Sequence, residues 1–306
     1  MKRHDNLKGS LILGFASLLW GLAFVAQSSA ADRVPSFLFN SLRSFIGAGF
    51  LFVLLCIFKK RAKKTIFPKE PHIRKSTCIS GLLCGLLLTV SVNFQQFGLA
   101  FYPEGVATEA RGGFLTALYV ILVPILSLFL GKRIGLPILG AVAVAMVGIY
   151  LLCLSEGFEG IYLGDVLILL CAVSFSFHIL VVDHYADAVG GVLLSMLQFL
   201  ICGILSGILS LCTEQIVWSQ IIDAAPQILY LGIVSSGIAY TLQIVGQKYA
   251  EPAVASISMS LESVFAALGG WLITKNTLTP REIGGCALVF AAIVLAQLPA
   301  FLKKRV

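Results

Sequence analysis

The chain has 306 residues, of which 58% are hydrophobic and only 12% charged, and its mean hydropathy is +0.96. This composition excludes a large soluble domain, because about a quarter of the residues in such domains are charged. The formal charge of +7, from 22 basic and 15 acidic residues, indicates nucleic-acid binding only where the excess lies on a solvated surface.

A membrane-spanning helix needs about 20 consecutive, mostly apolar residues, and ten stretches of this kind follow one another along the chain. They cover residues 9–29, 36–58, 76–99, 106–130, 135–154, 164–184, 190–212, 226–247, 253–274 and 282–301. Transmembrane β-strands are excluded, because the apolar runs are continuous and do not alternate with polar residues. We therefore predict an all-α integral membrane protein with ten transmembrane helices.

The basic residues predict the orientation of these helices. Eight lysines and arginines fill the connector between residues 59 and 75, and six more lie near the two ends of the chain. These residues, with Lys132, Arg133 and Lys248, fall on one side if all ten stretches cross the membrane. Cytoplasmic loops carry such an excess, so both termini are predicted to be cytoplasmic in a multi-pass protein of the cell membrane. The connector could also bind anionic lipid headgroups.

An internal duplication is indicated by weak matches between the two halves. At an offset of 155 residues Asp32 meets Asp187 and Arg43 meets Gln198, and at an offset of 148 residues 106–108 meet residues 254–256. We therefore expect two repeats of five helices, residues 1–155 and residues 156–306. Because five is odd, the repeats must be inverted relative to each other. This architecture is typical of secondary transporters, whose substrate site lies near the membrane midplane between the repeats.

Four short motifs carry a resemblance to a known family. They are Leu19-Trp20-Gly21, Arg43, the run from Gly113 to Tyr119 followed by Val123-Pro124, and the run from Leu261 to Ala267. In their order and spacing the chain resembles the EamA-type members of the drug/metabolite transporter superfamily. The resemblance implies a carrier of small metabolites, often an exporter of amino acids or related compounds, that works by alternating access without nucleotide hydrolysis.

The chain departs from the family pattern at three places. The family commonly has a glutamate just after the fourth and ninth stretches, where this chain has Gly131-Lys132-Arg133 and Thr274-Lys275-Asn276. Its usual proline after Glu262 is Ser263 here. No role of the missing glutamates is carried over.

Ionisable groups at membrane depth are costly and mark candidate sites. Glu262 lies about ten residues into its stretch, near the midplane. It could bind a substrate ammonium, couple transport to a proton, or be a structural carboxylate. Arg111, about two turns into the fourth stretch, could bind a substrate carboxylate or pair with Glu262. Arg43 is predicted to be a structural polar residue, as is Gln198 at the matching place in the seventh stretch.

Uncharged polar and aromatic residues complete the predicted cavity. Gln95 and Gln243 lie well inside their stretches, where an amide can bind a polar substrate or join helices. Trp20, Tyr119 and Tyr240 lie near mid-span, where they can line a cavity or pack in the core. His178 is a possible proton relay, although a lone buried histidine is more often neutral and hydrogen-bonded. We expect Glu262, Arg111, Gln95, Gln243, Trp20, Tyr119 and Tyr240 to border one central cavity.

Other function classes are less consistent with the sequence. No catalytic, metal-binding or cofactor-binding motif is recognisable, so we expect neither an enzyme nor a metal or cofactor. The expected partners are a small-molecule substrate and the lipid bilayer, without nucleic acid, and the oligomeric state is left open. The alternatives are a non-transporting membrane scaffold or assembly protein, and an importer of the same substrate class. Possible proton coupling through Glu262, with or without His178, completes the prediction.

Overall fold

The computed structural model describes residues 5–31, 33–61, 65–103, 108–132, 134–153, 162–274 and 279–303, and within these ranges every regular element is a helix. In chain order the helices are α1 (Asn6–Ala31), α2 (Ser36–Arg61), α3 (Pro71–Ala100), α4 (Thr108–Ala117), α5 (Tyr119–Phe129), α6 (Leu136–Cys153), α7 (Leu163–Tyr185), α8 (Gly191–Thr213), α9 (Trp218–Asp223), α10 (Ala225–Tyr230), the π-helix η1 (Leu231–Ala239), α11 (Tyr240–Gln247), α12 (Pro252–Met259), α13 (Leu261–Thr274) and α14 (Pro280–Lys303).

Eight helical stretches among the described residues are long and apolar enough to cross a membrane. They are Asn6–Ala31, Ser36–Phe58, Pro71–Ala100, Gly112–Phe129, Leu163–Tyr185, Gly191–Thr213, Ala225–Gln247 and Pro252–Gly269. The other two predicted spans fall on α6 and α14, whose described apolar stretches are shorter. The prediction of an all-α membrane protein is thus confirmed, whereas the count of ten spans stays a prediction.

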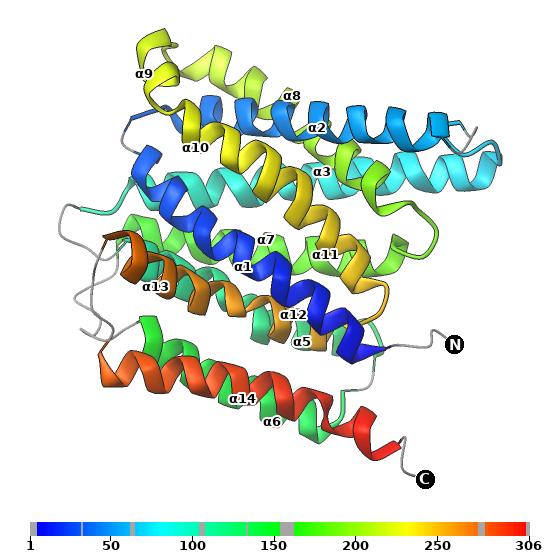
Figure 1. The fold of residues 1–306 in the computed structure, drawn as a ribbon, viewed down its shortest axis with the longest axis vertical. Coiled ribbons are helices and arrows are strands. Elements are labelled where there is room, and N and C mark those ends of the chain that lie inside the picture. Colours follow the sequence, from blue (N-terminus) through cyan, green and yellow to red (C-terminus); the bar gives the residue numbers. More distant parts are fainter. Residues whose placement is uncertain are drawn as a thin grey trace.

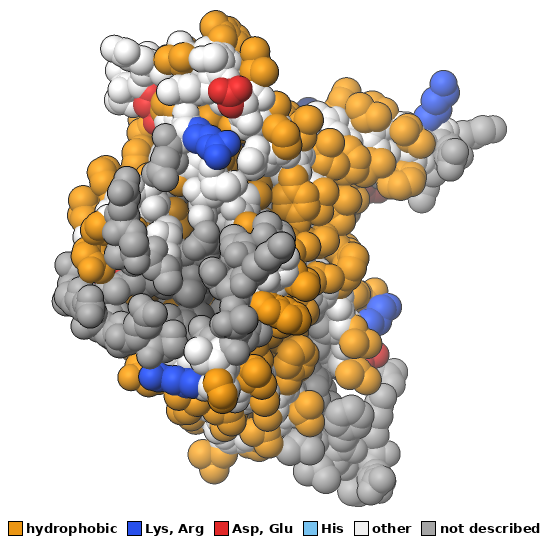
Figure 2. Space-filling view, turned by 60° about the vertical axis from the view of Figure 1, so that its left-hand side comes forward, with side chains coloured by type: hydrophobic (Ala, Val, Ile, Leu, Met, Phe, Trp, Pro, Cys, Tyr) orange, Lys and Arg blue, Asp and Glu red, His pale blue; other side chains and the backbone are white. Residues whose placement is uncertain are grey.

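The outer surface is rich in large apolar side chains. Phe129 is 85% exposed and Leu136 83% exposed, and Leu211 and Leu272 are also largely exposed. Figure 2 shows one face on which hydrophobic side chains dominate and few charged groups appear. A soluble monomer rarely exposes apolar surface on this scale, so this surface is suited to contact with lipid chains.

Helices from the two halves of the chain alternate in space (Figure 1). The most extensive helix contacts pair α6 with α14, α2 with α8, and α3 with α7, and α1 also packs along α13. Each pair joins a helix before residue 154 to a helix after residue 161. The start of α1, the end of α14 and the connector between α2 and α3 all lie at one end of the bundle, on the right in Figure 1. Among the described residues, Lys8, Lys60, Lys69, Arg74 and Lys75 are exposed in the segments at this end.

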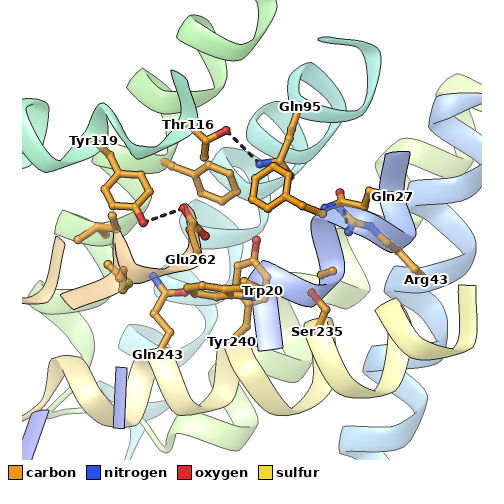
Figure 3. Close-up of a pocket in the computed structure, with 15 residues that line it drawn as sticks. Trp20, Gln27, Arg43, Gln95, Thr116, Tyr119, Ser235, Tyr240, Gln243 and Glu262 are labelled. Carbon is orange, nitrogen blue, oxygen red and sulfur yellow. Dashed lines mark hydrogen bonds between the residues drawn. The ribbon is translucent and has the colours of Figure 1, made fainter. Parts of the chain in front are cut away.

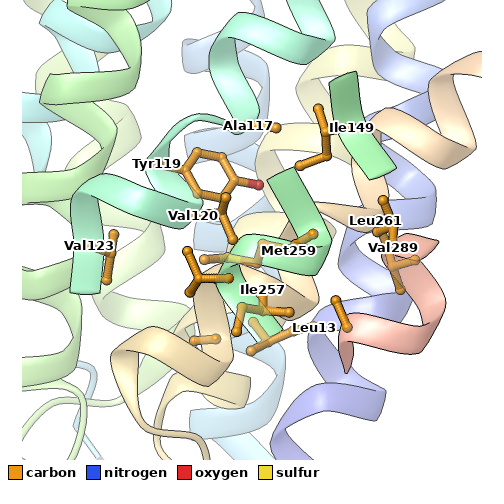
Figure 4. Close-up of a cluster of buried hydrophobic side chains, with 14 of the residues drawn as sticks. Leu13, Ala117, Tyr119, Val120, Val123, Ile149, Ile257, Met259, Leu261 and Val289 are labelled. Carbon is orange, nitrogen blue, oxygen red and sulfur yellow. The ribbon is translucent and has the colours of Figure 1, made fainter. Parts of the chain in front are cut away.

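The largest buried cluster packs α5 and α6 of the first half against α12 and α14 of the second half. Val120 and Val123 from α5 meet Ile149 from α6, Ile257 from α12 and Val289 from α14, all fully buried (Figure 4). Because lipid chains are as apolar as these residues, close packing stabilises the cluster more than transfer out of water does. The cluster fixes the relative positions of α5 and α12, which border the cavity described below.

An ion pair joins the two halves where α5 and α7 end. Lys132 follows α5, and its Nζ lies 2.6 Å from Oδ2 of Asp183 on α7. The Asp183 side chain is only 7% exposed, while that of Lys132 is 44% exposed. Because the lysine is partly solvated, the pair is expected to stabilise the fold only modestly.

We expect a double-mutant cycle on Lys132→Met and Asp183→Asn to give a coupling free energy of about 0.5–1 kcal/mol, because the pair is half solvated. Chemical denaturation of the detergent-purified protein measures it. Lys69→Met is the matched control, because Lys69 is exposed near the same end of the bundle. We expect this substitution to leave the free energy of unfolding unchanged. Strictly additive effects of the two substitutions would show that the ion pair does not contribute.

Candidate functional site

A small cavity lies between helices of the two halves (Figure 3). Its volume is about 40 Å³, room for about three water molecules. The first half contributes Trp20, Ala23, Phe24, Gln27, Arg43, Gln95, Thr116 and Tyr119, and the second half contributes Phe175, Ile179, Ser235, Tyr240, Gln243, Met259 and Glu262. A metabolite is too large for this space as the structure has it.

Two helix breaks border the cavity. α4 ends at Ala117 and α5 begins at Tyr119, and likewise α12 ends at Met259 and α13 begins at Leu261. Both breaks lie inside stretches that the sequence predicts as single spans. Leu118 and Ser260 keep right-handed helical dihedral angles, so each interruption is a local distortion within one continuous span. The breaks bring Thr116, Tyr119, Met259 and Glu262 onto the wall.

Serine side chains explain the second break. Ser258 Oγ donates a hydrogen bond to Val254 O at 2.8 Å, and Ser260 Oγ donates one to Ile257 O at 2.7 Å. Ser263 Oγ donates to Ser260 O, also at 2.7 Å. Hydroxyls that bond to nearby carbonyls compete with the helical pattern and bend or end helices. A run of alternating serines in an apolar stretch is therefore a sequence signal for this break.

A third irregularity is the π-helix η1, Leu231–Ala239. The N–H of Tyr240, just after it, donates to the carbonyl of Ser235, five residues earlier. This wider turn changes the direction of the following side chains, and π-turns often occur at functional sites. Ser235 and Tyr240 line the cavity together with Gln243 of α11.

Glu262 lies at one side of the cavity, in the first turn of α13. Tyr119 Oη donates a hydrogen bond to Glu262 Oε1 at 2.8 Å, and the glutamate is 6% exposed. No lysine or arginine in the described part of the chain forms an ion pair with Glu262. The carboxylate can therefore accept a further donor from the cavity.

Arg43 of α2 lies at the other side, next to Gln27 of α1 (Figure 3). Its Nη1 donates to Gln27 Oε1 at 3.3 Å, its Nε has no hydrogen-bond partner, and the residue is only 4% exposed. Among the residues that the structure describes, none supplies a carboxylate to Arg43. The cavity thus contains one acidic and one basic side chain, Glu262 and Arg43, that form no ion pair with each other.

Aromatic rings and amides form the walls between these charges. The rings of Trp20 and Tyr240 meet edge to face with centroids 4.9 Å apart, and Trp20 Nε1 has no hydrogen-bond partner. Gln95 Nε2 donates to Thr116 Oγ1 at 3.4 Å, and Gln243 Oε1 has no partner. An unpaired indole N–H and amide oxygen can bind polar groups of a ligand, while the ring faces can contact its apolar part.

Most of the residues predicted to border a cavity lie on this wall. They are Glu262, Gln95, Gln243, Trp20, Tyr119 and Tyr240. Arg111 belongs to α4, but its side chain is outside the described residues. Arg43, predicted to be structural, lies on the wall as well.

His178 and Gln198 lie behind the wall. His178 Nε2 is 2.9 Å from Gln198 Oε1, and the imidazole is fully buried. The ring centroids of His178 and Tyr240 are 6.3 Å apart. A ligand in the cavity would therefore contact Tyr240 and not the histidine.

Sequence reasoning missed several residues on the wall, among them Gln27, Thr116, Ser235, Phe24 and Phe175. Helical spacing could have found the two on α1. Phe24 and Gln27 follow Trp20 by four and seven residues, which places them on the same helix face. For Thr116 and Ser235 the local signals were a helix break and a π-turn, which helical periodicity does not reveal.

The chain is similar to proteins of one transporter family. The model of the EamA-like transporter family matches residues 7–154 and 162–298. An uncharacterized transporter of Archaeoglobus fulgidus is 28% identical over 297 residues, which cover 96% of this chain and 87% of the relative. The uncharacterized transporter YoaV of Bacillus subtilis is 25% identical over 303 residues, covering 93% of this chain and 96% of YoaV.

A solved crystal structure shares the fold. It aligns with a TM-score of 0.74 at 22% sequence identity and covers 96% of this chain and 98% of the other. At this level of identity the likeness concerns the arrangement of helices alone.

Proposed function

We propose that this chain, which belongs to the EamA-like transporter family, exports amino acids or related small metabolites across the cell membrane by alternating access. The relatives named as transporters match nearly the whole chain and support the transport role. The observation that carries the substrate class is the cavity between the halves, which contains a carboxylate, a guanidinium, amides and aromatic rings. Amino acids carry the complementary groups.

The proposed cycle opens this cavity to one side of the membrane at a time. The halves are proposed to be inverted repeats, residues 1–155 and 156–306, and the two successive family matches support this division. The main helix contacts join one half to the other. Rocking of one half against the other would therefore open one end of the cavity while the other end stays closed.

Proton coupling is proposed to occur at Glu262. The titratable groups near its carboxylate are Tyr119, Tyr240 and Cys171, and the charged residue on the opposite wall is Arg43. When ionised, Glu262 binds the ammonium of the substrate. When it takes up a proton from outside, it releases the substrate and returns in the protonated form, so that one proton enters for each substrate exported.

A ligand screen followed by flux measurement tests this function. A ligand that binds only the folded state at about 100 times its Kd stabilises it by about 2.7 kcal/mol. We expect amino acids to raise the unfolding temperature of the detergent-purified protein more than nucleosides, sugars or lipophilic cations do. In proteoliposomes, a compound that stabilises the protein should then exchange across the membrane.

The direction of substrate flux under a proton gradient distinguishes an exporter from an importer and from a scaffold. Export driven by an inward proton gradient supports the proposal, whereas uptake driven by the same gradient shows an importer. Ligand binding without flux, in vesicles that contain correctly folded protein, would contradict transport and support a scaffold function.

A further inference from the structure

We infer that Arg43, with Gln27, is a binding site for a carboxylate of the transported molecule. The cargo is then a zwitterion, held by its anionic end at Arg43 and by its cationic end at Glu262. The inference rests on the proposed function, because it requires that the cargo enters the central cavity. It assigns to Arg43 a role in substrate recognition where the sequence predicts a structural one.

The charge of Arg43 is the first argument. A buried arginine in a membrane protein is costly unless a partner compensates the charge. The guanidinium has five N–H donors, yet the structure gives it one hydrogen bond, the 3.3 Å contact with Gln27, and leaves Nε without a partner. A carboxylate that arrives with the substrate supplies the missing negative charge and can accept two of these donors side by side.

The second argument comes from polar contacts between neighbouring helices, which are made by uncharged amide side chains. Asn40, one turn before Arg43 on α2, donates to Val92 O at 3.0 Å and to Asn93 Oδ1 at 2.9 Å. In the other half, Gln198 takes the place that matches Arg43 and contacts His178. Packing of these helices therefore does not require a positive charge at position 43.

The layout of the cavity is the third argument. Arg43 and Gln27 lie on one side, and Glu262 and Tyr119 lie on the other (Figure 3). Trp20 Nε1, on the wall between them, has no partner and is a further donor for an anion. A molecule with an anionic and a cationic end would satisfy both sides at once, whereas a molecule with one charge leaves one side unpaired.

Removing one partner of a buried charge pair typically costs 2–5 kcal/mol, which corresponds to a loss of affinity of about 30-fold or more. The test measures Kd by titration calorimetry for an amino acid that stabilises the protein, for its carboxamide and for the amine that lacks the carboxyl group. We expect the wild-type protein to bind the amino acid at least about 30-fold more tightly than either analogue.

Variants at position 43 separate recognition from structure. Arg43→Gln should weaken binding of the amino acid to the level of the carboxamide and leave binding of the carboxamide unchanged. Arg43→Lys keeps the positive charge but not the planar set of N–H donors. Its affinity for the amino acid should lie between those of the wild-type protein and Arg43→Gln. Arg74→Gln, an exposed arginine at the start of α3, is the control that removes the same charge elsewhere and should keep the full discrimination.

Two binding results would overturn the inference. One is an Arg43→Gln variant that weakens the amino acid and the carboxamide equally, as a structural residue would. The other is equal affinity of the wild-type protein for the amino acid and its carboxamide. This measurement does not depend on whether a variant folds. Transport of ligands that all lack an anionic group would also overturn it, but would leave the transporter proposal intact. Absence of any ligand and any flux would instead reject the proposed function, and the inference with it.

Discussion

Replacing Glu262 by glutamine is expected to abolish export driven by a proton gradient, to the background of protein-free vesicles. Glutamine keeps the size of the side chain, and its amide oxygen can still accept the hydrogen bond from Tyr119 Oη that Glu262 receives at 2.8 Å. It cannot take up or release a proton between pH 5 and 9. The variant should therefore fold, lose the step that depends on protonation, and bind the ammonium group of the substrate more weakly. Flux of labelled substrate in proteoliposomes, together with a pH dye inside the vesicles, measures both movements.

Substrate exchange without a gradient gives a second measurement on the same variant. Exchange does not require net proton movement, so we expect Glu262→Gln to keep some exchange at a rate that no longer depends on pH. The matched control is Glu70→Gln, which makes the same chemical change at an exposed residue before α3. If Glu262→Gln supports normal export with the wild-type pH dependence, proton coupling through this residue is wrong.

The positions of the helices could be predicted closely from the sequence, because the bilayer fixes the length of each apolar run. The predicted stretch at 36–58 corresponds to α2, Ser36–Arg61, and the stretch at 190–212 to α8, Gly191–Thr213. The interruptions could not be predicted in this way. The breaks at Leu118 and Ser260 lie within single apolar spans, and the π-turn depends on which backbone hydrogen bonds form.

The sequence predicts how deep in the membrane a candidate site residue lies. It does not predict whether the side chain of that residue faces the cavity. A polar residue far from both ends of an apolar run must lie inside the membrane, and this reasoning selected Glu262, Gln95 and Gln243. The same reasoning selected His178, which bonds to Gln198 and lies behind the cavity wall. Whether a side chain faces the cavity depends on the rotation of its helix, which the neighbouring helices set. Arg43 faces the cavity for this reason, although its position in the sequence also fits a structural role.

The contact between α1 and α13 shows how closely the halves pack next to the site. A Cβ atom at Gly21 would lie 2.4 Å from Phe265 Cβ and 2.7 Å from the backbone N of Ala266. Backbone atoms cannot move aside as a flexible side chain can, so any larger residue forces the two helices apart. Trp20 and Glu262, which lie near this contact on the two helices, would then separate as well.

We expect Gly21→Ala to destabilise the protein by roughly 1–3 kcal/mol and Gly21→Val to prevent accumulation of folded protein, because the added atoms meet backbone. The matched control is Gly14→Ala, on the same helix, where the Cβ would meet only Leu261 Cδ1 at 3.6 Å. There the better helix propensity of alanine should leave stability unchanged or raise it by up to about 1 kcal/mol. Chemical denaturation in detergent compares the variants. Equal stability of the two alanine variants would contradict the close contact at Gly21. Packing between α1 and α13 would then not limit how far the two halves can separate there.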